Sequence, residues 1–214
     1  MKILRHLTLA GAIAGACVAA GAQTLTAAKA FVDAPRQVFP LLDRNARLDM
    51  VDYFTSGMNN TTANAMNGQS AITSLDPMRI SLKMTESSDY EIDLLPTAKG
   101  DTLLMLISTV ATPAPDSKMS IHSSDWQTDV TAPAFTRPTL KQWLTDKGRE
   151  NIGEVEALVP FLLISYSYDP STSVLKLTNN TRQFMSADLY EIVAPCLLPE
   201  QNYQWDGNKF TLRK

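Results

Sequence analysis

The stretch MRISLKM, residues 78–84, alternates apolar and polar side chains from end to end. On an extended chain, successive side chains point to opposite faces. The four apolar residues of this stretch therefore share one face, and the three polar residues between them share the other. The pattern predicts a β-strand with one face in a core and one face toward water.

The same period continues along the chain. YEIDL (90–94) and KMSIH (118–122) alternate in the same way, while LLMLI (103–107) is apolar on both faces. A strand that is apolar on both faces is typical of the centre of a sheet. Short polar segments between these strands suit hairpins, so we expect a four-stranded antiparallel meander over residues 77–122.

The residues before the meander follow a helical period. TAAKAFVD (26–33) and RQVFPLLDRN (36–45) each predict a short helix, and Pro40 forces a restart within the second. In NARLDMVDYFTSG (45–57), apolar residues recur every third position, and Asn45 is a candidate N-cap. We expect helices here, followed by a polar loop over residues 58–70.

Helices and strands alternate again after the meander. TLKQWLTDKG (139–148) and SADLYEIVAPCL (186–197) predict helices, FLLISYSY (161–168) and SVLKL (173–177) predict a strand pair, and YQWDGNKFTL (203–212) predicts a hairpin. The fold class is therefore α+β, with N-terminal helices, a four-stranded antiparallel meander, and a second half made of helix and hairpin.

The segment WQTDVTAPAFTR, residues 126–137, interrupts this order of elements: it mixes Thr, Ala and Pro with one aromatic that we expect to be buried, Phe135, and has no cluster of catalytic residue types. We interpret it as a linker or crossover loop rather than a lid. The domain is then a single α+β unit over residues 23–214, or two lobes, 24–125 and 138–214, that this segment joins.

The N-terminus has the pattern of a Sec signal peptide. Two basic residues precede an apolar run over residues 7–19, and the small residues Ala-Gly-Ala end just before Gln23. The run is too short for a transmembrane helix. We expect residues 1–22 to be cleaved before Gln23 and the protein to be exported to the periplasm, the cell surface or the medium; a lipid anchor at Cys17 is the less favoured alternative.

Cleavage would change the formal net charge from −3 to −5, because Lys2 and Arg5 are removed. No run of basic residues remains in the chain, so the sequence predicts no nucleic-acid binding and no adhesion to an anionic membrane. Cys196 would be the single remaining cysteine. Since no intramolecular disulfide could form, stability must come from the core.

Four segments in a fixed order resemble the signature of a secreted Bacteroidales family, domain of unknown function 3256. They are VFPLLDRNARLDMVDYF (38–54), NGQSAITSL (67–75), IDLLP (92–96) and TVATPAPDSKMSIHSSDW (109–126). The similarity runs from about residue 27 to the C-terminus. It implies export from a Gram-negative bacterium, and it brings no catalytic residue, cofactor or substrate.

The resemblance also gives a context for the tripeptide DTL at residues 101–103. This tripeptide is similar to the O-glycosylation acceptor pattern of exported proteins in those bacteria, with Thr102 as the acceptor. The alternative is that Thr102 simply begins a strand.

Hydrolase triads have little support. His122 is the one histidine after cleavage, and alternation turns it toward solvent. Ser123, Ser124 and Asp125 are its neighbours, but no Gly-x-Ser-x-Gly elbow presents a serine nucleophile. A dyad of Cys196 with His122 is the other option. Cys196 lies in an apolar context, where cysteine is usually a buried hydrophobe.

Metal and carboxylate sites are equally weak. Asp43, Asn45 and Asp49 begin like a calcium loop, but the mid-loop glycine and the terminal glutamate are missing. We expect Asp43 and Arg47, at i,i+4, to form a surface pair instead. No metal or cofactor is predicted.

Two carboxylate pairs share a face, Asp49 with Asp52 on a helix and Glu91 with Asp93 on a strand. A glycosidase needs two such groups in one cleft. We interpret both pairs as ordinary charged residues on solvent-exposed faces of a helix and a strand.

Aromatic residues offer a possible glycan or peptide platform, although core packing is the commoner use. They are Trp126, Trp143, Trp205, Tyr166, Tyr168 and Tyr203. The sequence therefore favours a non-enzymatic exported protein that binds an unknown protein or glycan partner in the cell envelope, with no assigned catalytic residue. A hydrolase with a carboxylate-based site is the alternative, and an envelope-assembly factor is a third possibility.

Overall fold

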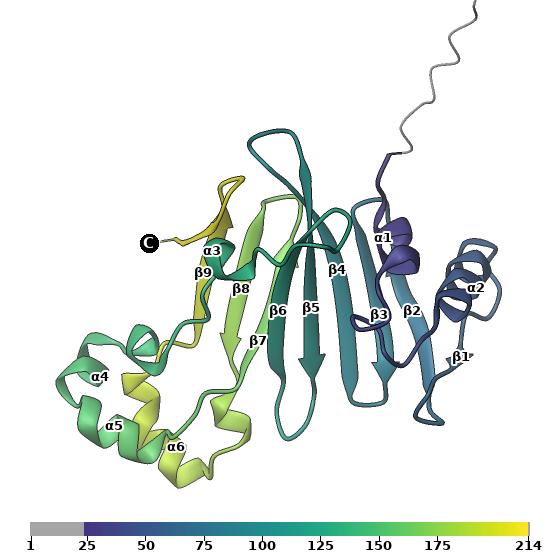
Figure 1. The fold of residues 1–214 in the computed structure, drawn as a ribbon. Coiled ribbons are helices and arrows are strands. Elements are labelled where there is room, and N and C mark those ends of the chain that lie inside the picture. Colours follow the sequence, from purple (N-terminus) through teal and green to yellow (C-terminus); the bar gives the residue numbers. More distant parts are fainter. Residues whose placement is uncertain (1–23, 214) are drawn as a thin grey trace, which may run out of the picture.

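Two antiparallel sheets form the framework of residues 24–213, the part of the chain that this computed structural model describes (Figure 1). The first has six strands in chain order: β1 (Thr62–Ala63), β2 (Gln69–Leu75), β3 (Arg79–Thr85), β4 (Ser88–Pro96), β5 (Thr102–Val110) and β6 (Asp116–Ser123). The second has the order β10-β9-β8-β7: β7 (Ile164–Asp169), β8 (Val174–Asn179), β9 (Glu200–Trp205) and β10 (Phe210–Leu212). The α+β class is confirmed.

The predicted meander corresponds to strands β3 to β6, but the sheet has six strands rather than four. The segment 58–70, expected to be a loop, contains β1 and the start of β2. The side chain of Asn64 organises this polar segment: it is buried, donates to Ser70 Oγ (3.1 Å) and Met84 O (3.1 Å), and accepts from Gly68 N (3.1 Å). Such a strand depends on its neighbours rather than on apolar alternation, which is why periodicity missed it.

Helices α1 (Ala27–Asp33) and α2 (Arg44–Thr55) contact the first sheet. Their core cluster joins both helices and the intervening segment to one face of β2 to β5, and its fully enclosed members include Phe31, Phe39, Met50, Ile80, Leu82, Ile92 and Leu104. Three residues of the apolar face predicted from MRISLKM, Ile80, Leu82 and Met84, therefore pack under these helices, whereas Met78 precedes β3 and is exposed. Figure 1 shows both helices beside β2 and β3.

Arg47 lies inside this helical layer, and the predicted surface pair with Asp43 is wrong. The guanidinium is buried and donates to the carbonyl oxygens of Phe31 (2.9 Å) and Ala34 (2.7 Å) at the end of α1. These carbonyls have no partner within the helix, because the last turn of a helix leaves its acceptors free. Arg47 satisfies them and ties α2 to α1.

Two further details of the N-terminal prediction are corrected. Residues 36–43 form turns rather than a helix, since Pro40 has no N–H to continue one. The N-cap of α2 is Asp43 instead of Asn45, and its Oδ1 accepts from Ala46 N at 2.8 Å. A carboxylate at this position also interacts favourably with the helix dipole.

The segment 126–137 is packed against the rest of the protein at both ends. Trp126 is buried against α1 and donates from Nε1 to Ala30 O at 3.0 Å. Phe135 contacts the rings of Tyr166 and Tyr203 edge-on, with centroids 5.9 and 5.6 Å away. Between them lies the short helix α3 (Thr131–Ala134). The segment thus connects the two apolar cores.

The second half contains several short helices. They are η1 (Leu140–Trp143), α4 (Asp146–Glu150), α5 (Ile152–Leu158), η2 (Thr181–Gln183), α6 (Ala187–Val193) and η3 (Ala194–Cys196). Helices α4, α5 and α6 gather at one end of the smaller sheet (Figure 1). The predicted helix that starts at Ser186 is present and Ser186 caps it. The predicted helix over 139–148 is broken, because Leu144 is extended and forms a bridge with Leu197.

The predicted strand pair and C-terminal hairpin are both present, and β8 pairs with β9 to join them into one sheet. Its apolar side packs with the first sheet into a shared core that includes Leu95, Met105, Ile107, Ile121, Trp143, Ile164, Tyr168, Leu175, Leu177 and Trp205. Residues from both predicted lobes therefore contribute to one cluster.

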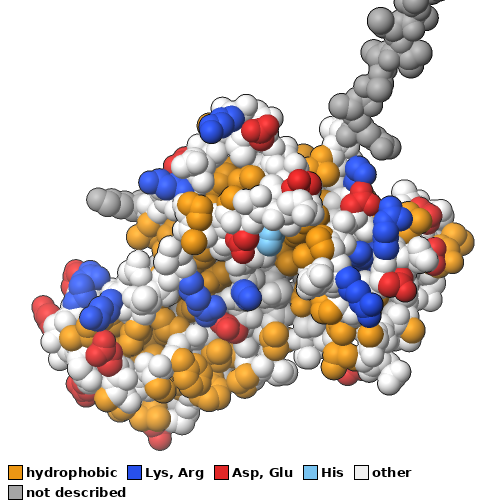
Figure 2. Space-filling view, viewed as in Figure 1, with side chains coloured by type: hydrophobic (Ala, Val, Ile, Leu, Met, Phe, Trp, Pro, Cys, Tyr) orange, Lys and Arg blue, Asp and Glu red, His pale blue; other side chains and the backbone are white. Residues whose placement is uncertain are grey.

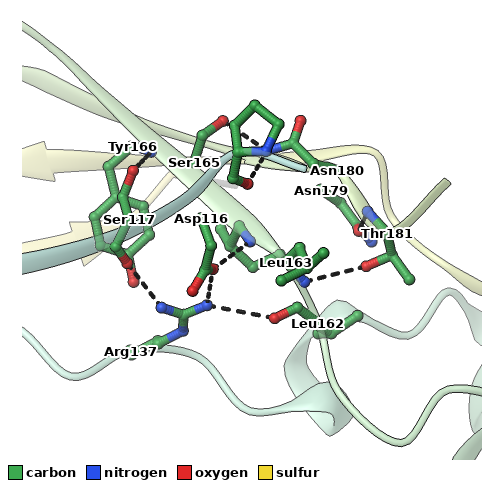
Figure 3. Close-up of polar contacts among 12 residues, drawn as sticks. Asp116, Ser117, Arg137, Leu162, Leu163, Ser165, Tyr166, Asn179, Asn180 and Thr181 are labelled. Carbon is green, nitrogen blue, oxygen red and sulfur yellow. Dashed lines mark hydrogen bonds and ion pairs between the residues drawn. The ribbon is translucent and has the colours of Figure 1, made fainter. Parts of the chain in front are cut away.

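Side chains of β6 bind the free edge of β7 where the two sheets meet (Figure 3). Asp116 Oδ1 accepts from Ile164 N (2.8 Å) and from the Arg137 guanidinium (2.6 Å), and Ser117 Oγ accepts from Tyr166 N (3.0 Å). Asn180 Nδ2 donates to Pro115 O at 2.7 Å. Edge N–H groups that would otherwise lack partners are thereby satisfied.

Two helical glycines give a matched test of the packing of α4. A Cβ at Gly148 would overlap the carbonyl oxygen of Cys196 in η3, whereas a Cβ at Gly153 in α5 would meet nothing within 4 Å. We expect G148A to lower the free energy of unfolding by about 2 kcal/mol through overpacking. G153A should raise it by about 0.5–1 kcal/mol through helix propensity. Equal effects in chemical denaturation would contradict the close approach of α4 to η3.

Candidate functional site

A charged cluster lies on the face of the first sheet opposite α1 and α2. Arg79 on β3 pairs in register with Asp93 on β4, and its Nε donates to Asp93 Oδ1 at 2.7 Å. Glu91, two residues before Asp93, approaches the same guanidinium at 3.4 Å. Arg79 also donates to the carbonyl oxygen of Tyr168 on β7. The predicted pair Glu91 and Asp93 is therefore brought together with an arginine.

Sequence reasoning named the two carboxylates but missed Arg79. The sequence did contain a signal. Arg79 lies on the polar face of the MRISLKM strand, and Glu91 and Asp93 lie on the polar face of the next strand along the chain. Strand register was needed to show that these residues are directly opposite each other.

Asp93 is the most perturbed carboxyl of the cluster. Its side chain is 0% exposed, and its Oδ2 has no hydrogen-bond partner. The pKa of Asp93 is raised to about 8: burial is the main cause, the negative charge of Glu91 adds to it, and Arg79 opposes both. Desolvation wins because one guanidinium is shared among Asp93, Glu91 and the Tyr168 carbonyl.

A polar groove of about 220 Å³ adjoins the cluster, between the first sheet and β7. Glu91 lines it together with Ser81, Thr109 and Ser167, but Asp93 lies beneath the surface. Acid–base catalysis requires that the catalytic group reach the reacting atom. With Asp93 enclosed and bonded to Arg79, this arrangement fits a structural contact better than a glycosidase pair: Arg79 joins β3 to β4 through Asp93 and to β7 through the Tyr168 carbonyl.

The other predicted carboxylate pair has no enclosed environment. Asp49 and Asp52 are both exposed on α2. Asp43, Asn45 and Asp49 belong to a helix and its cap rather than to a calcium loop. Among residues 24–213, no group of three His, Cys, Asp or Glu side chains is arranged to hold a metal ion.

His122 is half-buried rather than turned to solvent. Its ring packs against Trp126 with centroids 5.2 Å apart, and its Nε2 lies 3.0 Å from Ser120 Oγ. Burial lowers the pKa of His122, and the nearby Asp129 carboxylate opposes this. Ser123 Oγ instead donates to Asp125 at 2.6 Å. His122 and Asp125 therefore contact different serines, and the alternative of a Ser–His–Asp triad built from His122, Ser123 and Asp125 is not formed.

Cys196 is buried in a third apolar cluster with Leu144, Val155, Val159, Val193 and Leu197, to which His122 does not belong. The alternative of a Cys196–His122 dyad has no support, and the expectation that Cys196 is a buried hydrophobe holds.

The alternative of an aromatic binding platform is wrong, because its six candidate residues are all buried in the core: Trp126, Trp143, Trp205, Tyr166, Tyr168 and Tyr203. Thr102 is the first residue of β5, and its glycosylation stays a prediction.

An apolar groove of about 250 Å³ opens where the chain leaves α5 and where it enters α6. It is lined by Leu158, Val159, Pro160, Phe161, Thr181, Phe184, Met185, Ser186 and Leu189. Phe161 and Phe184 form its rim, with ring centroids 5.0 Å apart and exposed fractions of 47% and 49%. Figure 2 shows hydrophobic side chains gathered over this end of the molecule, at the lower left.

Local sequence explains why these rings stay exposed. Phe161 was expected to begin a strand, but β7 starts only at Ile164, because its partner β8 ends opposite Ile164, at Asn179, and the chain then turns into η2. Phe184 ends the turn η2 just before the cap of α6. Periodicity alone could not identify the groove, since its residues come from two loops.

Comparisons with known proteins address the family and the fold. The family described as "Protein of unknown function (DUF3256)" matches residues 18–210. A solved domain of an uncharacterized protein from Porphyromonas gingivalis W83 is similar in structure, with a TM-score of 0.75 and 16% identity over 87% of this chain and 96% of that chain. At this identity the likeness shows the fold alone. No curated protein matches the chain.

Within residues 24–213, no helix has both the length and the apolar character that crossing a membrane requires. The predicted signal peptide over residues 1–22 and the lipobox alternative at Cys17 lie outside the described residues.

The buried carboxyl makes stability depend on pH. Because the pKa of Asp93 is raised to about 8 from 3.8, the folded state keeps a proton that the unfolded chain releases. The free energy of unfolding should therefore fall as pH rises from about 4 to about 8 and then level off. We expect D93N, which mimics the protonated form, to remove this part of the slope in urea titrations at pH 5, 6.5 and 8.

D49N, which removes one exposed carboxyl from α2, is the control for the loss of a negative charge. If D93N kept the wild-type slope while D49N altered it, the buried carboxyl would not be the titrating group.

Proposed function

We propose that this chain, which belongs to the family described as "Protein of unknown function (DUF3256)", is an exported, non-enzymatic protein that binds a protein partner in the cell envelope. The observation that carries the proposal is the apolar groove with the half-exposed pair Phe161 and Phe184 at its rim. Contiguous exposed apolar surface on a soluble protein typically marks an interaction site.

The groove combines exposure with a firm base. Its floor includes the buried residues Val159 and Thr181, and Thr181 is fixed by bonds between its N–H and Asn179 Oδ1 (3.1 Å) and between its Oγ1 and Leu163 N (3.3 Å). The rim can therefore receive an apolar side chain without rearrangement of the base. Preformed pockets of this kind limit the entropy cost of binding.

The lining favours a protein segment over a glycan. Its polar side chains are Thr181 and Ser186, and both are engaged, Thr181 with Leu163 N and Ser186 as the N-cap of α6. A sugar requires several free donors and acceptors, whereas an apolar side chain requires only contact area. The two Phe rings are tilted by 50° to each other and so form a notch rather than a flat stacking surface.

Export is supported by the signal-peptide pattern of residues 1–22 and by the resemblance to a secreted family. Cleavage before Gln23 should give a mature chain of 192 residues. Intact-mass spectrometry of the protein purified from its native envelope should show this unmodified chain. A mass that corresponds to a diacylglycerol-modified chain starting at Cys17 would instead establish the lipid anchor.

A hydrolase built on Glu91 and Asp93 is the alternative function, and it has weaker support. The buried position of Asp93 keeps its carboxyl from a substrate in the adjacent groove. An envelope-assembly role remains a form of the binding function in which the partner is itself secreted.

The binding proposal predicts that partner capture depends on the groove. F161S/F184S should weaken capture from envelope extracts at least tenfold, because full burial of a Phe side chain contributes about 1.5–3 kcal/mol and about 1.4 kcal/mol is tenfold in affinity. Quantitative mass spectrometry of proteins retained by the immobilised mature chain measures the effect.

M58S/M66S is the matched control. Met58 and Met66 are 55% and 68% exposed and lie in the polar segment near β1, so the variant removes two exposed apolar side chains far from the groove in sequence. Equal losses in both variants, or no loss in either, would refute a role for the groove.

A further inference from the structure

We infer that the partner of this groove is an amphipathic protein segment that inserts two apolar side chains and carries lysine or arginine beside them. The inference rests on the proposed binding function and specifies the chemistry of the partner. It is argued from a second hollow beside the groove and from the charges that surround both.

The second hollow has a volume of about 190 Å³ and is lined by residues of α4, α5, α6 and η3. Its apolar lining comes from Val155, Leu158, Ile192, Val193 and Cys196. Leu158 lines both hollows, so they are adjacent.

Helix α6 presents Leu189 to the groove and Ile192 to the second hollow, and these side chains are 42% and 54% exposed. Residues three apart are neighbours on a helix surface. The two hollows are therefore suited to two apolar side chains of one segment, as in helix-in-groove recognition.

Acidic residues predominate around the two hollows. Glu154 lines the second hollow, Glu156 follows on α5, and Asp188 and Glu191 lie on α6 beside the exposed Leu189 and Ile192. All four carboxylates are exposed, and none takes part in an ion pair within residues 24–213.

The nearby cations compensate only part of this charge. Arg149 is paired with Asp146 at 2.5 Å, and the Arg182 guanidinium lies over the Tyr190 ring, 5.6 Å from its centroid. Lys147, which also lines the second hollow, and Arg182, whose charge the neutral Tyr190 ring does not cancel, remain as two basic groups beside four carboxylates. A basic segment would therefore meet a complementary potential, which favours its encounter and orientation.

The same charges argue against other occupants. Anionic lipid headgroups would be repelled by the acidic rim, since membrane-surface attraction needs basic residues. A second copy of this chain would place the same rim against itself in a two-fold interface, so that like charges would face each other. A basic protein segment avoids both penalties.

The test uses two fluorescein-labelled 14-residue peptides with identical leucine spacing. All the remaining positions are lysine in one peptide and glutamate in the other. Fluorescence anisotropy with the mature chain, residues 23–214, should show at least tenfold tighter binding of the Leu/Lys peptide. Its affinity should fall as salt rises from 50 to 300 mM, because exposed charges are screened.

Three variants separate apolar from charge recognition. F161S/F184S should weaken Leu/Lys binding at least tenfold. E154K/E191K should weaken it about five- to tenfold and improve binding of the Leu/Glu peptide. E86K/D101K makes the same charge change at exposed positions in the turns that flank β4, and it should alter the affinity by less than twofold.

Distinct failures refute distinct statements. Equal binding of both peptides, or equal losses in E154K/E191K and E86K/D101K, would overturn the inference of a basic partner. It would also be overturned if neither peptide bound, or if the groove instead bound vesicles of phosphatidylglycerol in a Phe161-dependent way. The binding function itself fails only if partner capture does not depend on Phe161 and Phe184.

Discussion

The edge of β7 is bound by side chains of β6 rather than by another strand, and the arrangement of the two sheets depends on this contact. The side chains of Asp116 and Ser117 accept hydrogen bonds from the backbone N–H groups of Ile164 and Tyr166. These bonds connect the second sheet to the first without a continuous strand ladder. A seventh strand added in register would have extended one flat sheet. Side-chain acceptors instead allow the strands to fold over a shared core, and they leave no open edge at the junction.

The polar side chains of Arg47, Arg79 and Asp93, all buried or partly buried, connect secondary-structure elements to one another. Arg47 ends α1 by binding its free carbonyls, and Arg79 joins β3 to β4 through Asp93 and to β7 through Tyr168. Each lies where two elements meet and where backbone groups would otherwise lack partners. The perturbed carboxyl of Asp93 is a consequence of this position, since a charge placed between two sheets loses its hydration. Strong perturbation therefore indicates architecture here, although it often indicates catalysis elsewhere.

The apolar groove lies apart from these joints, at the end of the molecule formed by α5 and α6. Its rim residues are Phe161, in the loop before β7, and Phe184, in the segment after β8, and neither belongs to the core shared by the two sheets. Exposed rings that contribute little to folding are free to contribute to association. The exposed acidic residues Glu154 on α5 and Glu191 on α6 are the basis for the inferred basic partner.

Strong periodicity allowed the sequence by itself to determine the strands β3 to β6, the pair β7 and β8, and the C-terminal hairpin. Each of these elements carries its own apolar face, and alternation identifies such a face without knowledge of what covers it. Tertiary structure alone decided that β1 and β2 extend the sheet, that Arg47 and Asp93 are buried, and that Phe161 and Phe184 meet in a groove. Pairing partners, dielectric environment and the convergence of two loops are properties of distant residues brought together, and no local pattern contains them.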